Sequence, residues 1–166
     1  DVTNRTRPVL RWTLGPGQLP GIGETWSTPS ITRVRVGSAT QNGEKLVLVF
    51  GGGYDDAQEN YTYTTDTAGH RIYMVDAQTG ALLWYAGGPD GSGTPDLELD
   101  AMTHSIPGRV VTLDIDGDQF ADRMYAADMG GRVWRFDIWN GEPRGSLVTG
   151  GVLAALGAGS TGDTSI

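Results

Sequence analysis

The chain has 166 residues, about the size of one domain, with 12 basic and 20 acidic side chains and a formal net charge of −8. This acidic balance argues against binding to nucleic acid, whose phosphates need a basic surface, and it suits a protein that binds hard cations. Cysteine is absent, which excludes disulfide bonds and thiolate zinc sites, and no apolar run reaches the roughly 18 residues that span a bilayer.

Apolar residues recur with a period of two along most of the chain, which is typical of β-strands. The predicted strands are, in chain order, 8–15, 25–37, 44–53, two within 70–88, 108–116, 122–131 and 132–141. The run at 44–53 is continuously apolar, as expected of a strand buried on both faces. No segment has a clear helical period, although GGVLAALGAG at 150–159 could form one helical turn.

A hairpin is predicted within 70–88. Its two strands are joined at 76–80, where Asp76 can accept hydrogen bonds from the turn backbone and Gly80 can adopt a positive φ. Trp26, Trp84 and Trp134 recur at strand positions, and we expect them in the core or in the packing between blades.

The chain contains an internal repeat. IYMVDAQTG and VWRFDIWNG, which begin at Ile72 and Val133, share their apolar positions, an aspartate and a closing glycine. Their separation fits a four-stranded unit, and such a unit repeated with glycine and aromatic residues is typical of a β-propeller blade.

We therefore expect an all-β fold, an incomplete β-propeller of about two four-stranded blades plus a flanking strand. Propellers close with four to eight blades, so the chain, which does not begin with Met, is expected to be a piece of a longer one. Its single partial domain, 1–166, divides into the end of a preceding blade (8–15), one blade (25–88), the next blade (105–150) and a linker (151–166).

The stretch DIDGDQFAD at 114–122, here called the aspartate loop, places four carboxylates within nine residues. Like charges this close repel one another unless a cation lies among them. Calcium takes six to eight oxygen ligands, and alternate positions of a tight loop direct their oxygens inward. The candidate calcium ligands are the side chains of Asp114, Asp116, Asp118 and Asp122 and the carbonyl of Phe120.

This loop departs from common calcium loops at its sixth position, where Gln119 replaces the glycine that a positive φ favours. It also lies between strands and lacks the twelfth-position glutamate of an EF-hand. We expect a working site of weakened affinity. The alternative is a solvated acidic turn whose aspartates accept hydrogen bonds from backbone amides.

The remaining polar clusters favour structural interpretations. Two further acidic groups are expected to be solvated loops, and they comprise Asp55, Asp56 and Glu59, and Asp96, Glu98 and Asp100. The histidines are His70 and His104, and neither has a serine and an acid at a spacing that predicts a catalytic triad. The sequence thus predicts no catalytic residues.

Several motifs carry a family resemblance. They are GETWSTPSITRV, LVLVFGGGYD, IYMVDAQTGALLW, HSIPGRVVTLDIDGDQFADRMYAADMGGRVWRFDI and GGVLAALG, in this order from about 8 to 157. The chain resembles the C-terminal β-propeller of the PilC/PilY family of type IV pilus biogenesis proteins and tip adhesins. That resemblance implies seven modified blades and a calcium-binding loop with the ligands named above.

The resemblance also implies a non-enzymatic role, in which calcium occupancy favours pilus extension over retraction and supports surface attachment. The implied partners are minor pilins, the secretin and the missing blades, with no nucleic acid and no membrane span. The implied location is the bacterial cell surface or pilus tip, after export through the periplasm and outer membrane.

Two alternatives stay open. IYMVDAQTGALLW is also similar to the repeats of quinoprotein dehydrogenases, propellers that hold pyrroloquinoline quinone beside calcium, although fold alone does not give function. The other alternative is a propeller scaffold in which calcium has a purely structural role.

Overall fold

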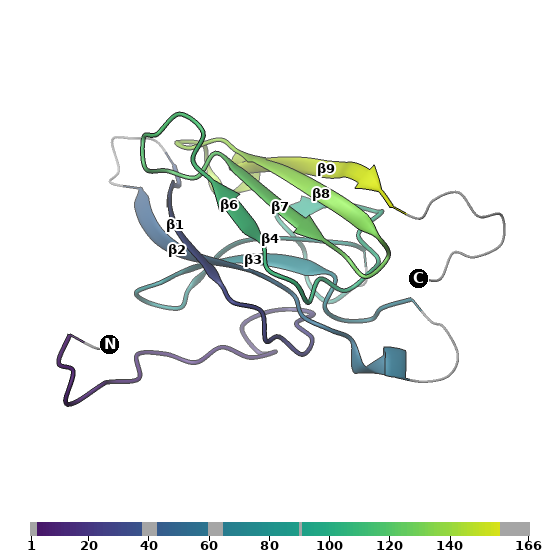
Figure 1. Ribbon diagram of the computed structural model, residues 1–166, viewed down its shortest axis with the longest axis horizontal. Helices are drawn as coiled ribbons and strands as arrows, with labels where there is room; N and C mark the ends of the chain where they lie inside the picture. Colours follow the sequence, from purple (N-terminus) through teal and green to yellow (C-terminus); the bar gives the residue numbers. More distant parts are fainter. Residues whose placement is uncertain (1–2, 38–42, 60–64, 90, 157–166) are drawn as a thin grey trace.

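A computed structural model of the chain describes residues 3–37, 43–59, 65–89 and 91–156. They form two β-sheets (Figure 1), which confirms the all-β class, and neither sheet closes on itself within these ranges. Two 3-10 turns, η2 (Asp56–Glu59) and η3 (Arg144–Ser146), are too short to cross a bilayer, and the described residues hold no longer apolar helix.

The first sheet has five strands, which lie side by side in chain order and are antiparallel except for a parallel last pair. They are β1 (Ser30–Arg35), β2 (Glu44–Gly51), β3 (Arg71–Asp76), β4 (Leu82–Gly87) and β5 (Leu97–Glu98). The predicted hairpin is confirmed as β3 and β4. Asp76 Oδ1 accepts hydrogen bonds from the N–H groups of Gln78 (2.8 Å) and Thr79 (3.0 Å), and Gly80 has a φ of +74°.

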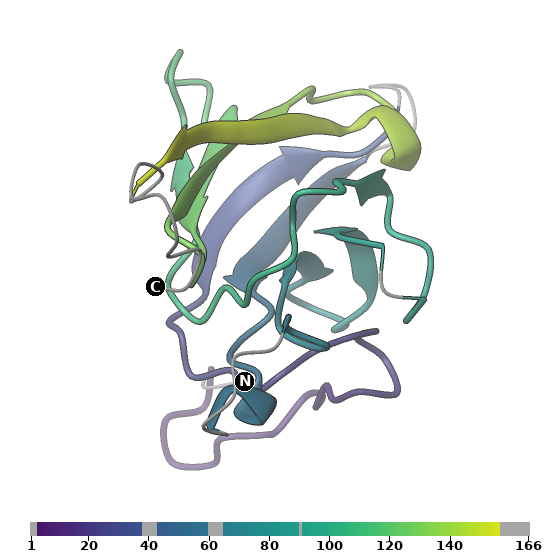
Figure 2. The ribbon, with the colours of Figure 1, turned by 90° about the vertical axis from the view of Figure 1, so that its right-hand side faces the viewer.

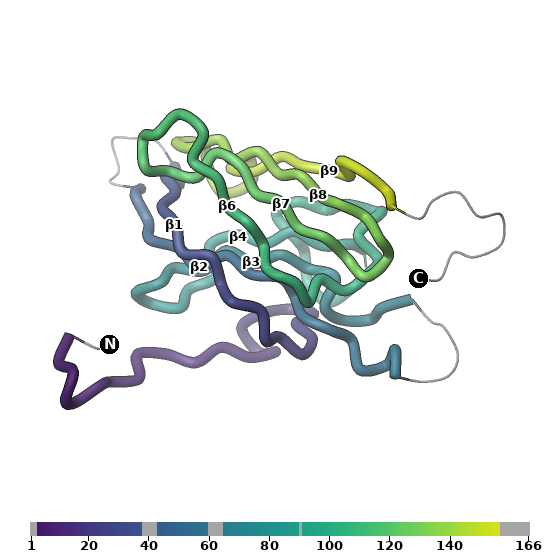
Figure 3. Tube along the Cα trace, viewed as in Figure 1, coloured from purple at the N-terminus to yellow at the C-terminus, as the bar shows by residue number. Residues whose placement is uncertain are grey.

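The second sheet has four antiparallel strands, also in chain order. They are β6 (Val111–Leu113), β7 (Arg123–Ala127), β8 (Arg132–Ile138) and β9 (Val148–Ala155). The second sheet lies over the first, as the turned view shows (Figure 2). The chain trace shows β6 close to β1 (Figure 3), where the Ser30 hydroxyl donates a hydrogen bond to the Val110 carbonyl.

One apolar core joins the two sheets. It contains Trp84 and Trp134, both almost completely buried as predicted, and Phe136 makes an edge contact with Trp84 at 6.3 Å between ring centroids. A smaller cluster on the far face of the first sheet includes Phe50 and Tyr73. All six residues of β3 are buried because apolar side chains cover both of its faces.

Two expectations are wrong, and a third is narrowed. Residues 8–15 form no strand, because no described strand pairs with them. Instead Trp12 packs against the smaller cluster and donates from Nε1 to the Ala77 carbonyl at 3.3 Å. The helical turn and the linker from 151 are replaced as far as Ala155 by β9, which pairs with β8 along its length. Trp26 is 66% exposed and so lies outside the core, which leaves packing between blades as the expectation for this side chain.

Candidate metal centre

The aspartate loop connects β6 to β7 at one end of the second sheet. Its base is closed by a hydrogen bond from the N–H of Asp122 to the Leu113 carbonyl at 2.8 Å. Asp114 and Asp116 are exposed and Asp122 is half-buried. The loop therefore presents its carboxylates to solvent from a fixed strand end.

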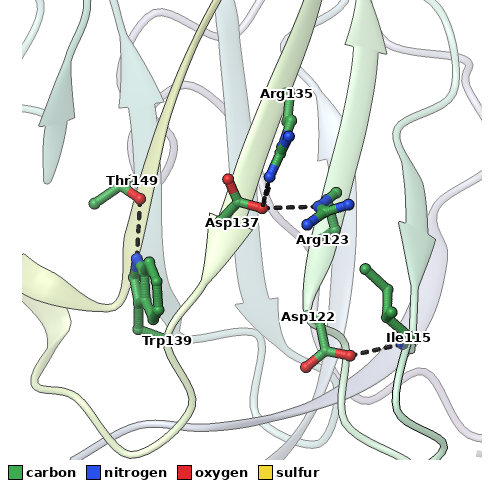
Figure 4. Close-up of polar contacts among 7 residues, drawn as sticks. All are labelled: Ile115, Asp122, Arg123, Arg135, Asp137, Trp139 and Thr149. Atoms are coloured by element: carbon green, nitrogen blue, oxygen red, sulfur yellow. Dashed lines mark hydrogen bonds and ion pairs between the residues drawn. The ribbon is translucent and has the colours of Figure 1, made fainter.

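Backbone N–H groups orient each carboxylate. Asp114 accepts from Gly117 (2.6 Å) and Gln119 (2.8 Å), and Asp122 accepts from Ile115 at 2.6 Å (Figure 4). These bonds are the Asx contacts of a tight turn, and each leaves lone pairs on the carboxylate for another donor or a cation.

Three of the four carboxylates converge. Ligand oxygens of Asp114, Asp116 and Asp122 all lie within 4.8 Å of one another. Two oxygens that share a calcium ion, each at about 2.4 Å, are separated by no more than about 4.8 Å. These three side chains fit one ion, so the cluster could hold a metal.

The other two predicted ligands are less directly supported. Asp118 is outside the converging group, and its Oδ1 accepts a hydrogen bond from the N–H of Phe120 at 2.8 Å. The Phe120 side chain is buried, with the Arg35 guanidinium 4.4 Å from its ring centroid. Calcium ligation by Asp118 and by the Phe120 carbonyl stays a prediction.

The sixth loop position has the conformation that the sequence predicts. Gln119 has a φ of +76° and is the one non-glycine residue with a positive φ in the described part of the chain. A side chain in this region costs about 1 kcal/mol. The loop keeps its turn despite this strain.

A polar groove of about 530 Å³ adjoins the loop. Across it, Asp137 Oδ1 accepts hydrogen bonds from Arg123 Nε at 2.7 Å and Arg135 Nη2 at 2.9 Å (Figure 4). Partial burial raises the pKa of Asp137, but the hydrogen bonds from Arg135 and Arg123 outweigh it and hold the pKa below its usual value. No pattern in the sequence predicts this trio, which depends on the strand register that places Arg123 directly opposite Asp137.

The groove's arginines do not neutralise the loop. Arg123 and Arg135 both pair with Asp137, and Arg35 pairs with Glu44 at 3.2 Å. In the described part of the chain no basic side chain forms an ion pair with a carboxylate of the aspartate loop. The repulsion among these carboxylates is therefore not offset by an ion pair with a described basic side chain.

The other acidic groups have structural partners. Asp55 was expected in a solvated loop but is buried, and it accepts hydrogen bonds from the N–H groups of Ala57 (3.0 Å) and Ala68 (3.1 Å). Asp96 forms a two-pronged ion pair with Arg144, at 2.7 and 2.9 Å. Neither arrangement brings carboxylates together.

The chain is similar in sequence to known pilus biogenesis factors. No family model matches the chain. It is 27% identical over 145 residues to the type IV pilus biogenesis factor PilY1 of Pseudomonas aeruginosa, and 25% identical over 133 residues to a PilY1 homolog of Xylella fastidiosa. These matches cover 86% and 80% of this chain but only 10% and 8% of the relatives, so the chain spans about a tenth of their length.

A solved structure is also similar. The crystal structure of the Pseudomonas aeruginosa PilY1 C-terminal domain superposes with a TM-score of 0.56 and 26% identity, and the match covers 82% of this chain and 23% of that one. The chain is a homologue of the PilY1 C-terminal domain. The PilC/PilY resemblance is thus confirmed, and the PilY1 relatives are named as pilus biogenesis factors.

Proposed function

We propose that this chain is a calcium-binding portion of a β-propeller in a type IV pilus biogenesis protein with a non-enzymatic role. The observation that carries the proposal is the convergence of three aspartate oxygens within 4.8 Å in a homologue of the PilY1 C-terminal domain. Calcium suits this site better than magnesium, because exposed carboxylates on a turn match its preference for several flexible oxygen ligands.

The sheet arrangement supports the propeller part of the proposal. Each sheet contains four antiparallel strands in chain order, as in a propeller blade, and the first strands of the two sheets lie close together. The proposed blades correspond to 25–88 and 105–150, with β5 and the end of β9 as additions. Further blades would lie elsewhere in a longer protein, since this chain covers 23% of the matched domain.

The proposed role is to couple calcium to pilus dynamics. A bound ion would tie the end of β6 to the start of β7, whereas an empty loop would carry repelling carboxylates that loosen this edge. The calcium-bound form would favour pilus extension and surface attachment, and the empty form would favour retraction. The proposed location is the cell surface or pilus tip, with minor pilins or the secretin as partners.

Calcium titration tests the site. At a calcium concentration about 100 times Kd, a single site should stabilise the protein by about 2.7 kcal/mol. We expect Asp116→Asn to abolish most of this gain in urea denaturation, while Asp100→Asn, at an exposed aspartate outside the loop, keeps it. Asp118→Asn tests whether Asp118 is a further ligand beside the three converging aspartates. Its calcium response should resemble that of Asp116→Asn only if Asp118 binds the ion.

An equal calcium response in wild type and Asp116→Asn would refute the calcium site. The pilus role needs its own measurement, namely surface pili counted in bacteria that carry the variant within the full-length protein. Loss of pili with Asp116→Asn supports regulation by calcium.

A purely structural site is the second candidate. The N–H of Ile138 donates to the Asp122 carbonyl at 2.7 Å, so the last residue of the loop is already part of the sheet. Under this alternative, calcium raises stability while Asp116→Asn still supports normal piliation.

A further inference from the structure

A second polar pocket lies away from the aspartate loop, beside the segment that leads into β3. Its volume is about 280 Å³, and its lining includes Asp66, His70, Met102 and Pro89. The first three are buried and Pro89 is exposed, so the pocket has a buried polar floor and an exposed rim.

The decisive feature of this pocket is the Asp66 carboxylate, which is 8% exposed. Its Oδ2 accepts hydrogen bonds from the backbone N–H and the hydroxyl of Ser105, whereas its Oδ1 is buried and has no partner among the described residues. The neighbouring Asp55 differs, because both of its oxygens accept backbone N–H bonds. A buried carboxylate oxygen requires a hydrogen-bond donor or a cation, and no described residue supplies one to Asp66 Oδ1.

The lining argues against a metal ion. A protein metal site supplies three or more ligands, as in zinc and calcium centres. In the described part of the chain, the aspartate loop holds the one cluster of three or more His, Cys, Asp or Glu side chains, so Asp66 and His70 do not belong to such a cluster.

The same lining fits an ammonium group. Such a group has three N–H donors, one for Asp66 Oδ1 and others for the hydroxyl oxygens of Thr65, Thr67 and Thr103, which also line the pocket. Pro89, exposed at the rim, offers apolar contact to a methylene stem, and the buried Met102 lies behind it in the lining. We propose that this pocket binds a primary alkylammonium group, such as the side chain of a lysine on a partner protein.

The ligand is not available from this chain. Its one lysine, Lys45, has its Nζ 3.5 Å from Asp76 Oδ2 on the first sheet. The ammonium group must therefore come from outside these 166 residues.

The test uses three probes and the methyl NMR signals of the four methionines. The peptide acetyl-Gly-Lys-Gly-amide and n-butylammonium should each shift the Met102 methyl signal in a saturable manner. The norleucine peptide, which has the stem without the charge, should not. Asp66→Asn should weaken binding by about tenfold or more, as expected for loss of a hydrogen bond to a charged group.

Controls separate binding from misfolding. Asp100→Asn also removes one negative charge and should bind as wild type does, and unchanged Met74 and Met124 signals show an intact core. If Asp66→Asn does not fold, Thr103→Val replaces it and should weaken lysine-peptide binding severalfold.

Three outcomes overturn the proposal. They are equal binding of the lysine and norleucine peptides, unchanged affinity in the folded variant, and a Met102 shift caused by calcium that depends on Asp66. Tighter binding of the lysine peptide than of n-butylammonium identifies a polypeptide as the source, and equal binding identifies a free amine. Because the readout is at Met102, this result is independent of calcium binding by the aspartate loop.

Discussion

The loop around Asp55 and the aspartate loop are both rich in acids, yet they differ in how deeply their carboxylates are buried and in whether these groups converge. Asp55 is buried and accepts backbone N–H bonds on both oxygens, so this loop is complete without a ligand. Asp114 and Asp116 are exposed and converge with Asp122, and no described basic side chain pairs with them. The number of acids in a stretch therefore does not distinguish the two loops, whereas the burial and the convergence of their carboxylates do.

Breaking the Asp55 loop gives the largest expected effect. Asp55→Ala leaves the N–H groups of Ala57, Thr67 and Ala68 without their acceptor and should lower the free energy of unfolding by about 3 kcal/mol. Urea denaturation with and without calcium measures the loss. The same loss should occur in both conditions, and Asp56→Ala, at an exposed neighbour, should have little effect. A loss that calcium restores would contradict the contrast between the loops.

Acid titration tests the carboxylates that already accept hydrogen bonds within the protein, namely Asp55 and Asp137. Partial burial raises the pKa of Asp55, but backbone hydrogen bonds from Thr67, Ala57 and Ala68 outweigh it, and the pKa of Asp137 is likewise lowered. Their stabilising effect is complete above the unfolded pKa of about 4 and is lost as the pH falls through the lower folded pKa.

We expect Asp137→Asn to reduce the loss of stability as the pH falls below about 4, measured without calcium by thermal unfolding. Asp100→Asn is the matched control for removal of one charge. An acid response as steep in Asp137→Asn as in wild type would show that Asp137 is not held ionised by its two arginines.

The smallest expected effect concerns the strained sixth position of the aspartate loop. Gln119→Gly removes a side chain from a positive φ and should raise the free energy of unfolding by about 0.5–1 kcal/mol and tighten calcium binding. Gly117→Ala, at a φ of +83°, is the reciprocal variant and should do the opposite. Calorimetric titration measures the calcium affinity, and urea denaturation measures the free energy of unfolding. A change in the same direction for both variants would exclude strain as the cause.

The sequence predicts most of the strands because period-two patterns and turn residues act locally. It misses β5, whose two residues are too short to show a period, and it misreads the glycine-rich β9. Gly150 lies opposite Phe136 in the sheet, where a Cβ would come within 2.3 Å of the ring. That glycine reflects a close strand contact, which no local pattern indicates.

The sequence likewise predicts only part of the candidate site. Spacing along the loop predicts the convergence of Asp114, Asp116 and Asp122 and the positive φ of Gln119. It does not predict that Asp118 turns to the Phe120 N–H, because this choice depends on competing hydrogen bonds. The pairing of Arg123 with Asp137 depends on strand register, which is set by the whole sheet.

Asp122 gives the aspartate loop a mechanical property. Its N–H and carbonyl bond to Leu113 and Ile138, on the strands at either side of β7. Tension applied along β7 would therefore load these two backbone bonds together with the carboxylate of the same residue. An ion bound to the Asp122 carboxylate would bear part of this force together with the two backbone bonds. Release of the ion would leave the two backbone bonds to carry the force alone at the start of β7.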